Sequence, residues 1–220
     1  MSYPSIPHRE EDWSRITGLI KAYPFAHLFT GSGTRARVTR LPFAFDDNGE
    51  GGGSLRAHMD ARNPQVSALD DTDVLVAFSG PDAYVSPNWR NDRSRGATWD
   101  YTAVHIWGRA VIRRDRDFFA TLIRDLAAPA EEKYQSLSDA PTWTFEDAPE
   151  DYVNRLLPHL VGFEITITRV EAISKLHQDF APKDALRVAD HLAQSPNEDG
   201  RTIASLIQAK TALKQAKRTS

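Results

Sequence analysis

The sequence predicts a mainly β (α+β) fold, with strands in the centre of the chain and helices towards its ends. Two observations support this class. Several central segments alternate apolar and polar residues with the two-residue period of a strand, and turn-forming Gly, Ser, Asn and Asp separate them. The first and last segments instead repeat apolar residues every three or four positions, as amphipathic helices do. Since 40% of the 220 residues are hydrophobic, the chain can fill a core.

The N-terminal half is expected to hold one helix followed by strands. Residues 13–23 have apolar side chains at helical spacing, and Pro24 should end that helix. Residues 24–30 and 35–43 are typical of two strands joined by a Gly–Ser turn. Residues 46–54 should form a flexible turn. The apolar run 73–80 indicates a buried strand, which continues into a hairpin with a long polar loop.

Residues 98–112 form the most unusual predicted strand. One parity carries apolar side chains, from Val104 to Ile112, as a core face should. The other parity should meet a ligand or a second protomer. That second face carries Trp99, Tyr101, His105, Trp107 and Arg109.

The C-terminal half is expected to alternate helices with one secure strand. Residues 118–126 and 152–157 have helical patterns, and Pro158 should stop the second. Residues 161–168 alternate cleanly with Val161 inward, and the buried part of this strand should end near Ile167. Two polar helices, at 183–194 and 201–217, should follow with a linker between them.

Composition narrows the function classes. The formal net charge is −3, so the chain lacks the basic excess of a nucleic-acid binder. There is no cysteine, and the seven histidines lack metal-ligand spacing, so no metal site is predicted. Neither a GxGxxG nor a GxSxG motif occurs, and no catalytic residue can be named. With neither a signal peptide nor an apolar span evident, we expect a cytoplasmic protein without membrane contact.

Three runs, residues 55–66, 78–90 and 98–108, combine aromatic, basic and amide side chains in segments that otherwise resemble strands. Such groups suit a planar aromatic ligand with an anionic end. In the first run, Arg62 could clamp a phosphate with His58 and Asn63 as neutral donors. The alternative is a strand that simply ends in a polar turn.

The second and third runs also leave two interpretations open. Ser86 and Trp89 flank Pro87, where side chains should be fixed yet accessible, and are candidate ligand contacts. Trp99 and Tyr101 offer aromatic faces to a ligand, although aromatic stripes are also common in cores and interfaces.

These runs, together with residues 162–179, resemble in order and wording the motifs of the PaiB family, the FMN-binding negative transcriptional regulators. The resemblance covers roughly residues 1–190 and depends on several ordered motifs. The matching positions include His58, Asn63, Pro64, Gln65, Gly80, Pro81, Tyr84, Ser86, Trp89, Thr98, Trp99, Tyr101, His105, Gly108, Gly162, Phe163, Glu164, Lys175, Leu176 and Gln178.

The resemblance implies an antiparallel split β-barrel, FMN-binding-protein-like, with flanking helices. It implies a homodimer that binds FMN between protomers. Arg62, His58 and Asn63 would hold the phosphate, and Trp99 would contact the flavin ring. Lys175 or Gln178 could reach the flavin's polar edge. Residues 1–180 would form the barrel domain and residues 181–220 a helical extension.

The chain departs from the family pattern at several positions. Arg62 stands one place later than the family's arginine. The departures that bear on FMN affinity are this shifted Arg62, Arg90 for Tyr, Ala172 and Ile173 for Gly-Lys, and His177 for Ser, and the change at Arg90 and the polar loop after it also bear on substrate access. Two further departures are Asp100 and Asp179, each in place of Asn.

Two further functions stay open. The family name implies a transcriptional repressor, but the sequence shows no helix-turn-helix on a basic face, so DNA contact could reside in the C-terminal helices or in a partner protein. A flavin-dependent oxidoreductase or a haem-handling protein is the other alternative, with His105 or His177 as the iron ligand to test.

Overall fold

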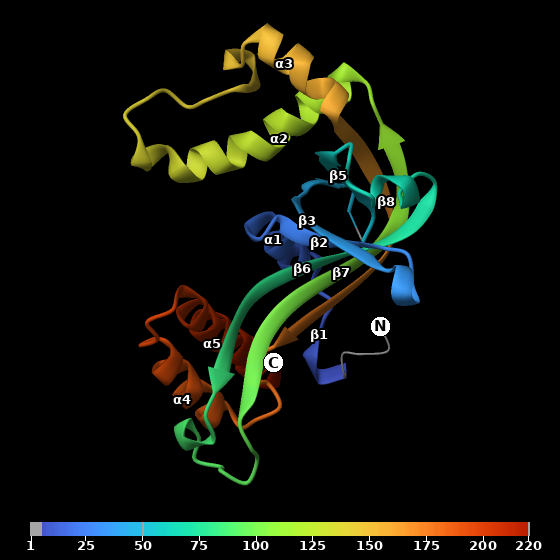
Figure 1. The fold of residues 1–220 in the computed structure, drawn as a ribbon. Coiled ribbons are helices and arrows are strands. Elements are labelled where there is room, and N and C mark those ends of the chain that lie inside the picture. Colours follow the sequence, from blue (N-terminus) through green and yellow to red (C-terminus); the bar gives the residue numbers. More distant parts are fainter. Residues whose placement is uncertain (1–5, 50, 220) are drawn as a thin grey trace. The chain divides into compact units, whose positions relative to one another are not determined.

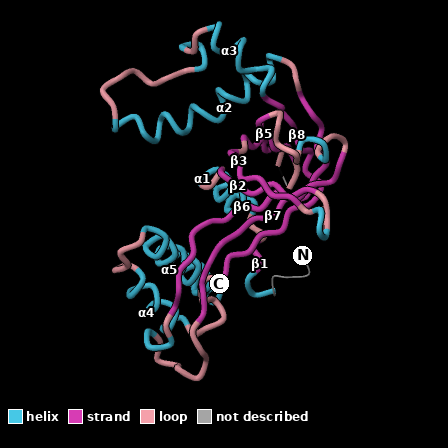
Figure 2. Tube along the Cα trace, viewed as in Figure 1, coloured by secondary structure: helices cyan, strands magenta, loops and turns pink. Residues whose placement is uncertain are grey.

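The computed structural model describes residues 6–49 and 51–219. By its internal contacts the chain divides into two compact units. Unit 1 comprises Met1–Leu19, Ser79–Val104 and Glu171–Ser220, and unit 2 comprises Ile20–Phe78 and His105–Val170. Figures 1 and 2 show the elements along the chain. Three long strands contribute a part to each unit, namely β6 (Thr72–Val85), β7 (Thr98–Arg113) and β8 (Leu160–Lys175).

Unit 2 is built on antiparallel strand pairs. Its shorter strands are β2 (Phe25–Thr30), β3 (Arg37–Pro42), β4 (Ala44–Asp47) and β5 (Gly53–Asp60). β2 pairs with β3 and with β6, and β5 pairs with β4 and with β8. The strand order β3-β2-β6-β7-β8-β5-β4 confirms the predicted antiparallel, mainly β class.

The core of unit 2 follows the predicted strand periods. Phe43 lies edge-on to Phe78 and to Phe163, with ring centroids 5.9 and 6.3 Å apart. The inward parity of β8, from Val161 to Ile167, is buried as expected. These apolar contacts are the main source of the unit's stability.

Helices complete unit 2. α2 (Arg116–Tyr134) begins where the Asp115 carboxylate accepts a hydrogen bond from the Phe118 amide at 2.7 Å, an N-cap. α2 buries Phe119 and Leu122. α3 (Glu150–Leu156) ends before Pro158, as predicted.

Unit 1 has its own apolar core. β1 (Arg9–Glu10) pairs with the end of β8, and α1 (Trp13–Ala22) has the predicted bounds within one residue. The C-terminal helices α4 (Pro182–Leu192) and α5 (Glu198–Thr219) pack against the end of β6. The division at residue 180 stays a prediction. This second core includes Ala83, Val85, Leu176, Val188, Leu192, Ile203 and Ile207.

Two sequence expectations differ from the structure. Residues 44–47 form the strand β4, although part of that segment was expected to be a turn. β8 continues to Lys175, and burial returns at Ala172–Ser174 after the exposed Arg169. The prediction that its buried part ends near Ile167 is therefore wrong for the whole strand, because β8 enters a second core in unit 1.

Single turns of 3-10 helix connect many elements. They are Ile6–His8, Gly33–Arg35, Val66–Ala68, Pro87–Trp89, Gln135–Leu137, Phe145–Asp147 and Leu157–His159. Among the described residues, no helix combines the length and the apolar character needed to cross a membrane.

Candidate functional site

The predicted ligand contacts belong to both units. His58, Arg62 and Asn63 lie in unit 2, at the end of β5 and in the turn after it. The other six lie in unit 1, and each set is described within its own unit. Those six are Ser86, Trp89, Trp99, Tyr101, Lys175 and Gln178.

Arg62 is accessible, but a carboxylate already occupies part of its guanidinium. Its side chain is 88% exposed. Nε and Nη2 donate to the two carboxylate oxygens of Asp60 at 3.0 and 2.6 Å. The guanidinium holds the pKa of Asp60 well below its usual range. An anion at Arg62 would therefore have to share its donors with Asp60.

Asn63 ties the turn to the sheet. Its Nδ2 donates to Thr39 Oγ1 at 3.0 Å, and its Oδ1 accepts from the Gln65 amide at 2.9 Å. The buried Gln65 side chain donates in turn to the Leu28 carbonyl at 3.0 Å. These bonds fix the conformation of the turn, so the Asn63 amide already has a structural role.

His58 is a partly buried imidazole. Its ring lies edge-on to Phe119, with centroids 6.5 Å apart. Burial lowers the pKa of His58, which favours the neutral ring. Its Nδ1 atom is buried and has no hydrogen-bond partner among the described residues.

A second arginine contacts the same turn. Arg37 of β3 donates from Nη1 to the Pro64 carbonyl at 2.6 Å. The turn after β5 therefore has two guanidinium groups, Arg37 and Arg62, with exposed side chains. No local pattern points to Arg37, because the contact joins residues 27 positions apart.

In unit 1, Trp99 is the accessible member of an aromatic group. Trp99 is 54% exposed and Tyr84 is 47% exposed, and their rings meet edge to face at 6.1 Å. Trp89 instead stacks on His191 of α4 at 5.5 Å and packs against the apolar core. Trp99 is thus better placed than Trp89 to contact a ligand ring.

The remaining predicted contacts hold local structure. Lys175 Nζ donates to Thr98 Oγ1 and to the Trp99 carbonyl, the latter at 2.6 Å, and so fixes the start of β7. Gln178 Nε2 donates to the Pro7 carbonyl at 2.9 Å. Ser86 Oγ accepts from the Asn88 amide at 3.2 Å and caps a 3-10 turn. Tyr101 is partly exposed on the same strand face as Trp99.

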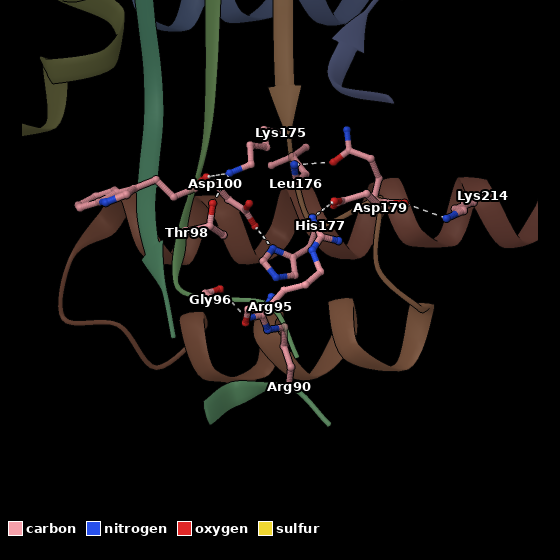
Figure 3. A network of polar contacts seen from close by, with 12 residues as sticks. Arg90, Arg95, Gly96, Thr98, Asp100, Lys175, Leu176, His177, Asp179 and Lys214 are labelled. Atoms are coloured by element: carbon pink, nitrogen blue, oxygen red, sulfur yellow. Dashed lines mark hydrogen bonds and ion pairs between the residues drawn. The ribbon is translucent and has the colours of Figure 1, made fainter. Parts of the chain in front are cut away.

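A pocket of about 220 Å³ lies in unit 1 between the loop before β7 and the turn after β8 (Figure 3). His177 Nδ1 and Asp100 Oδ2 are 2.6 Å apart there, and both side chains are buried. His177 adopts the left-handed backbone conformation, with φ 56°, and stacks on Phe180 at 4.5 Å. Such a backbone is rare for histidine and marks a constrained turn.

Arg90 forms another wall of this pocket and is 1% exposed. Its Nη2 donates to the carbonyls of Arg95 and Gly96 at 2.6 and 2.8 Å. Its guanidinium carbon lies 4.5 Å from the centroid of the Phe180 ring, a cation–π contact. Some buried polar atoms of Arg90 and of its neighbours in the pocket have no hydrogen-bond partner among the described residues. They are Arg90 Nε and Nη1, Asp100 Oδ1 and His177 Nε2.

Four departures from the family pattern meet in this pocket. They are Arg90, Asp100, His177 and Asp179, which all line it. The sequence shows each as a separate replacement of a neutral residue, and only the fold brings them together. The clue available in the sequence was that all four replacements bring ionisable groups.

The comparisons agree with this fold. The family model described as "Putative FMN-binding domain" matches residues 2–169. The chain is 28% identical over 209 residues to "Protease synthase and sporulation protein PAI 2" of Bacillus subtilis, covering 94% of this chain and 95% of that protein.

Solved structures share the fold at low identity. A conserved hypothetical protein of Mycobacterium tuberculosis aligns with a TM-score of 0.56 at 15% identity, over 81% of this chain and 94% of that one. An FAD- and haem-binding protein of Mycobacterium smegmatis aligns with a TM-score of 0.52 at 15% identity, over 80% and 78%.

The fold and the family match define the class as the FMN-binding split-barrel proteins. Within that class, the chain belongs to the PaiB family of FMN-binding domains.

Proposed function

We propose that this chain works as an FMN-binding regulator of the PaiB type and that the turn after β5 receives the FMN phosphate. The observation that supports this most is the presence of two exposed guanidiniums, Arg62 and Arg37, on one turn. Arginine suits phosphate because its donors match the oxygen geometry. Asn63 would act by fixing this turn, and His58 by offering its buried Nδ1.

We further propose Trp99, with Tyr84 against its edge, as the contact for the isoalloxazine ring. Both side chains are about half exposed, and aromatic pairs stabilise flat apolar ligands. Lys175 would position Trp99 through its bond to the Trp99 carbonyl. FMN supplies the redox chemistry when bound, and the chain supplies binding and electrostatic tuning.

The phosphate role is tested by titrating FMN into paired variants at the turn. Arg62→Ala should weaken FMN binding roughly tenfold, since hydrogen bonds between charged groups are the stronger kind. Asp60→Asn should tighten binding, because it removes the carboxylate that competes for Arg62. Unchanged affinity in Arg62→Ala would refute the clamp. Flavin fluorescence quenching provides the readout.

The ring contact is tested separately, since either role can be right without the other. Trp99→Ala should weaken FMN binding several-fold and alter the flavin absorption band. Trp143→Ala is the matched control, because Trp143 is 38% exposed in unit 2 and has no proposed role. Equal affinities in both variants would exclude Trp99 as the ring contact.

A homodimer is the proposed assembly. The exposed Tyr84 and Trp99 support it, because aromatic side chains are enriched at interfaces. Light scattering should give twice the chain mass, with one FMN per chain. A monomer that still binds FMN would contradict the assembly.

Transcriptional regulation is the proposed biological role, taken from the name of the PaiB family, the FMN-binding negative transcriptional regulators. The net charge of −3 gives direct DNA contact little support, although the end of α5 carries Lys210 and Lys214. A gel-shift series with upstream DNA at several salt concentrations tests it. A sequence-specific complex with a steep salt dependence would support repression.

A flavin-dependent oxidoreductase remains the alternative activity, tested by NADH or NADPH oxidation with the FMN-loaded protein. Haem handling has less support from the geometry. His177 is 1% exposed, stacked on Phe180 and bonded to Asp100, so its ring is poorly accessible to a haem iron. His105 lies edge-on to Trp107 at 6.2 Å.

A further inference from the structure

We propose that the unit 1 pocket beside Arg90 is a binding site for a small carboxylate-bearing molecule, separate from the FMN contacts proposed above. Arg90 would anchor the carboxylate, and His177 would provide a second contact through Nε2. This inference does not depend on FMN binding, and each can fail without the other.

Arg90 is buried and only partly hydrogen-bonded. Its charge is buried, at 1% exposure, and only Nη2 is bonded, to two backbone carbonyls. Nε and Nη1 have no acceptor among the described residues. A buried guanidinium with unmet donors is costly unless an acceptor satisfies it. A carboxylate in the adjoining pocket would satisfy both the charge and the donors.

The charges of the described residues that line the pocket also indicate an anionic ligand. Asp179 pairs with Arg95 at 2.6 Å, and Asp100 pairs with His177. Lys175 donates to neutral oxygens of Thr98 and Trp99. Arg90 has no carboxylate partner in the pocket, and the nearby Asp92 is exposed and bonded to Ser94. Arg90 and Lys175 therefore both lack a carboxylate partner among these residues, so positive charge is in excess and an anion is favoured.

The small number of unmet donors in the pocket favours a carboxylate over a phosphate. A phosphate dianion would need more donors and would face the carboxylates of Asp100 and Asp179, which also line the pocket. A carboxylate needs only a few donors and carries a single charge.

The volume of the pocket and the residues of its wall indicate a small organic ligand. The pocket volume of about 220 Å³ is below the range of about 300–1,000 Å³ for drug-sized ligands, so the occupant should be small. The Phe180 ring lies 4.5 and 4.1 Å from the guanidinium carbons of Arg90 and Arg95 and stacks on His177, and it gives the pocket one aromatic wall. A short-chain organic acid fits this combination.

His177 adds selectivity. Because its Nδ1 is bonded to Asp100, only Nε2 can serve a ligand, and that atom has no partner among the described residues. A proton on Nε2 would let that atom donate a hydrogen bond to a carboxylate oxygen of the ligand. Arg90 and His177 both contact the Phe180 ring and both line the pocket, so both can face one small anion.

The experiment is a titration of the full chain with acetate, followed through arginine side-chain Nε–H signals in nitrogen-15 NMR. Arg90→Lys identifies the Arg90 signal by its loss. Acetate should shift that signal saturably, whereas inorganic phosphate at the same ionic strength should not. The proposal is overturned if acetate gives no saturable shift, or if phosphate saturates the signal first.

Variants then test the assigned contacts through an acetate-dependent rise in melting temperature. Arg90→Lys should weaken acetate binding roughly tenfold or more, and His177→Gln should weaken it several-fold. Arg113→Lys is the control, since Arg113 pairs with Glu164 in unit 2. FMN titration of each variant should be unchanged, which separates this site from the flavin contacts. If Arg90→Lys does not fold, the acetate-dependent rise in melting temperature of the wild type and its reduction in His177→Gln still decide.

Discussion

Three arginines of this chain carry the same charge in three different surroundings. Arg62 is exposed and bonded to Asp60, Arg90 is buried against Phe180, and Arg169 lies over the Trp107 ring at 3.7 Å. Among these three, the sequence could predict a ligand role for Arg62 only. It could not predict which of them is buried, because burial depends on contacts between distant segments.

At the residue scale, His58 should make stability depend on pH. Burial lowers its pKa, so the folded protein binds this proton less readily than the unfolded chain does. Its contribution is therefore complete above the unfolded value of about 6.5 and is lost as the pH falls below it. Urea unfolding at pH 7.5 and 5.5, roughly one unit either side of that value, should show a smaller loss in His58→Phe than in the wild type. Equal losses would contradict this.

At the scale of single strands and helices, the two-residue alternation of strands was the best predictor of which residues are buried. Alternation alone predicted the inward residues of β8 from Val161 to Ile167 and, in β7, the burial of Val104, Ile106 and Ala110, whereas Ile112 is only partly buried. The two-residue period did not predict burial at the end of β8. This strand contributes to two cores, and its burial begins again at Ala172. Asp100 and Thr102 are also buried on the core-facing side of β7, although their polar side chains gave no reason to expect burial there.

Gly108 should be essential to the close approach of β7 and β8. A Cβ atom there would lie 2.4 Å from the Thr166 carbonyl oxygen, which is too close for any side chain. Gly108→Ala should lower the unfolding free energy by about 1–3 kcal/mol, as overpacking does. Gly18→Ala is the control, with open space around it in α1, and should stabilise by about 0.5–1 kcal/mol. Thermal unfolding compares the two; a neutral Gly108→Ala would refute the packing account.

The C-terminal helices should contribute to the stability of unit 1. Ile207 of α5 is fully buried, so Ile207→Ala should cost about 2–5 kcal/mol. Leu213 on the same helix is 43% exposed, and Leu213→Ala should cost well under half as much. Urea denaturation measures both. Similar costs for the two variants would mean that α5 does not pack as described.

At the scale of the whole molecule, each unit is assembled from separated segments of the chain. Unit 1 joins residues from the beginning, the middle and the end. The four ionisable departures come from two of these segments and meet in one pocket. The sequence could identify each departure, but their meeting follows from strand order and from the turn at His177, which no local pattern reveals.

The family assignment gives the molecule its central function, FMN binding, and one titration tests it most directly. Purified protein should be titrated with FMN while flavin fluorescence and the visible absorption spectrum are followed. The account predicts saturable quenching with one FMN per chain and a shifted flavin band. Fluorescence that stays unquenched at saturating protein would contradict it.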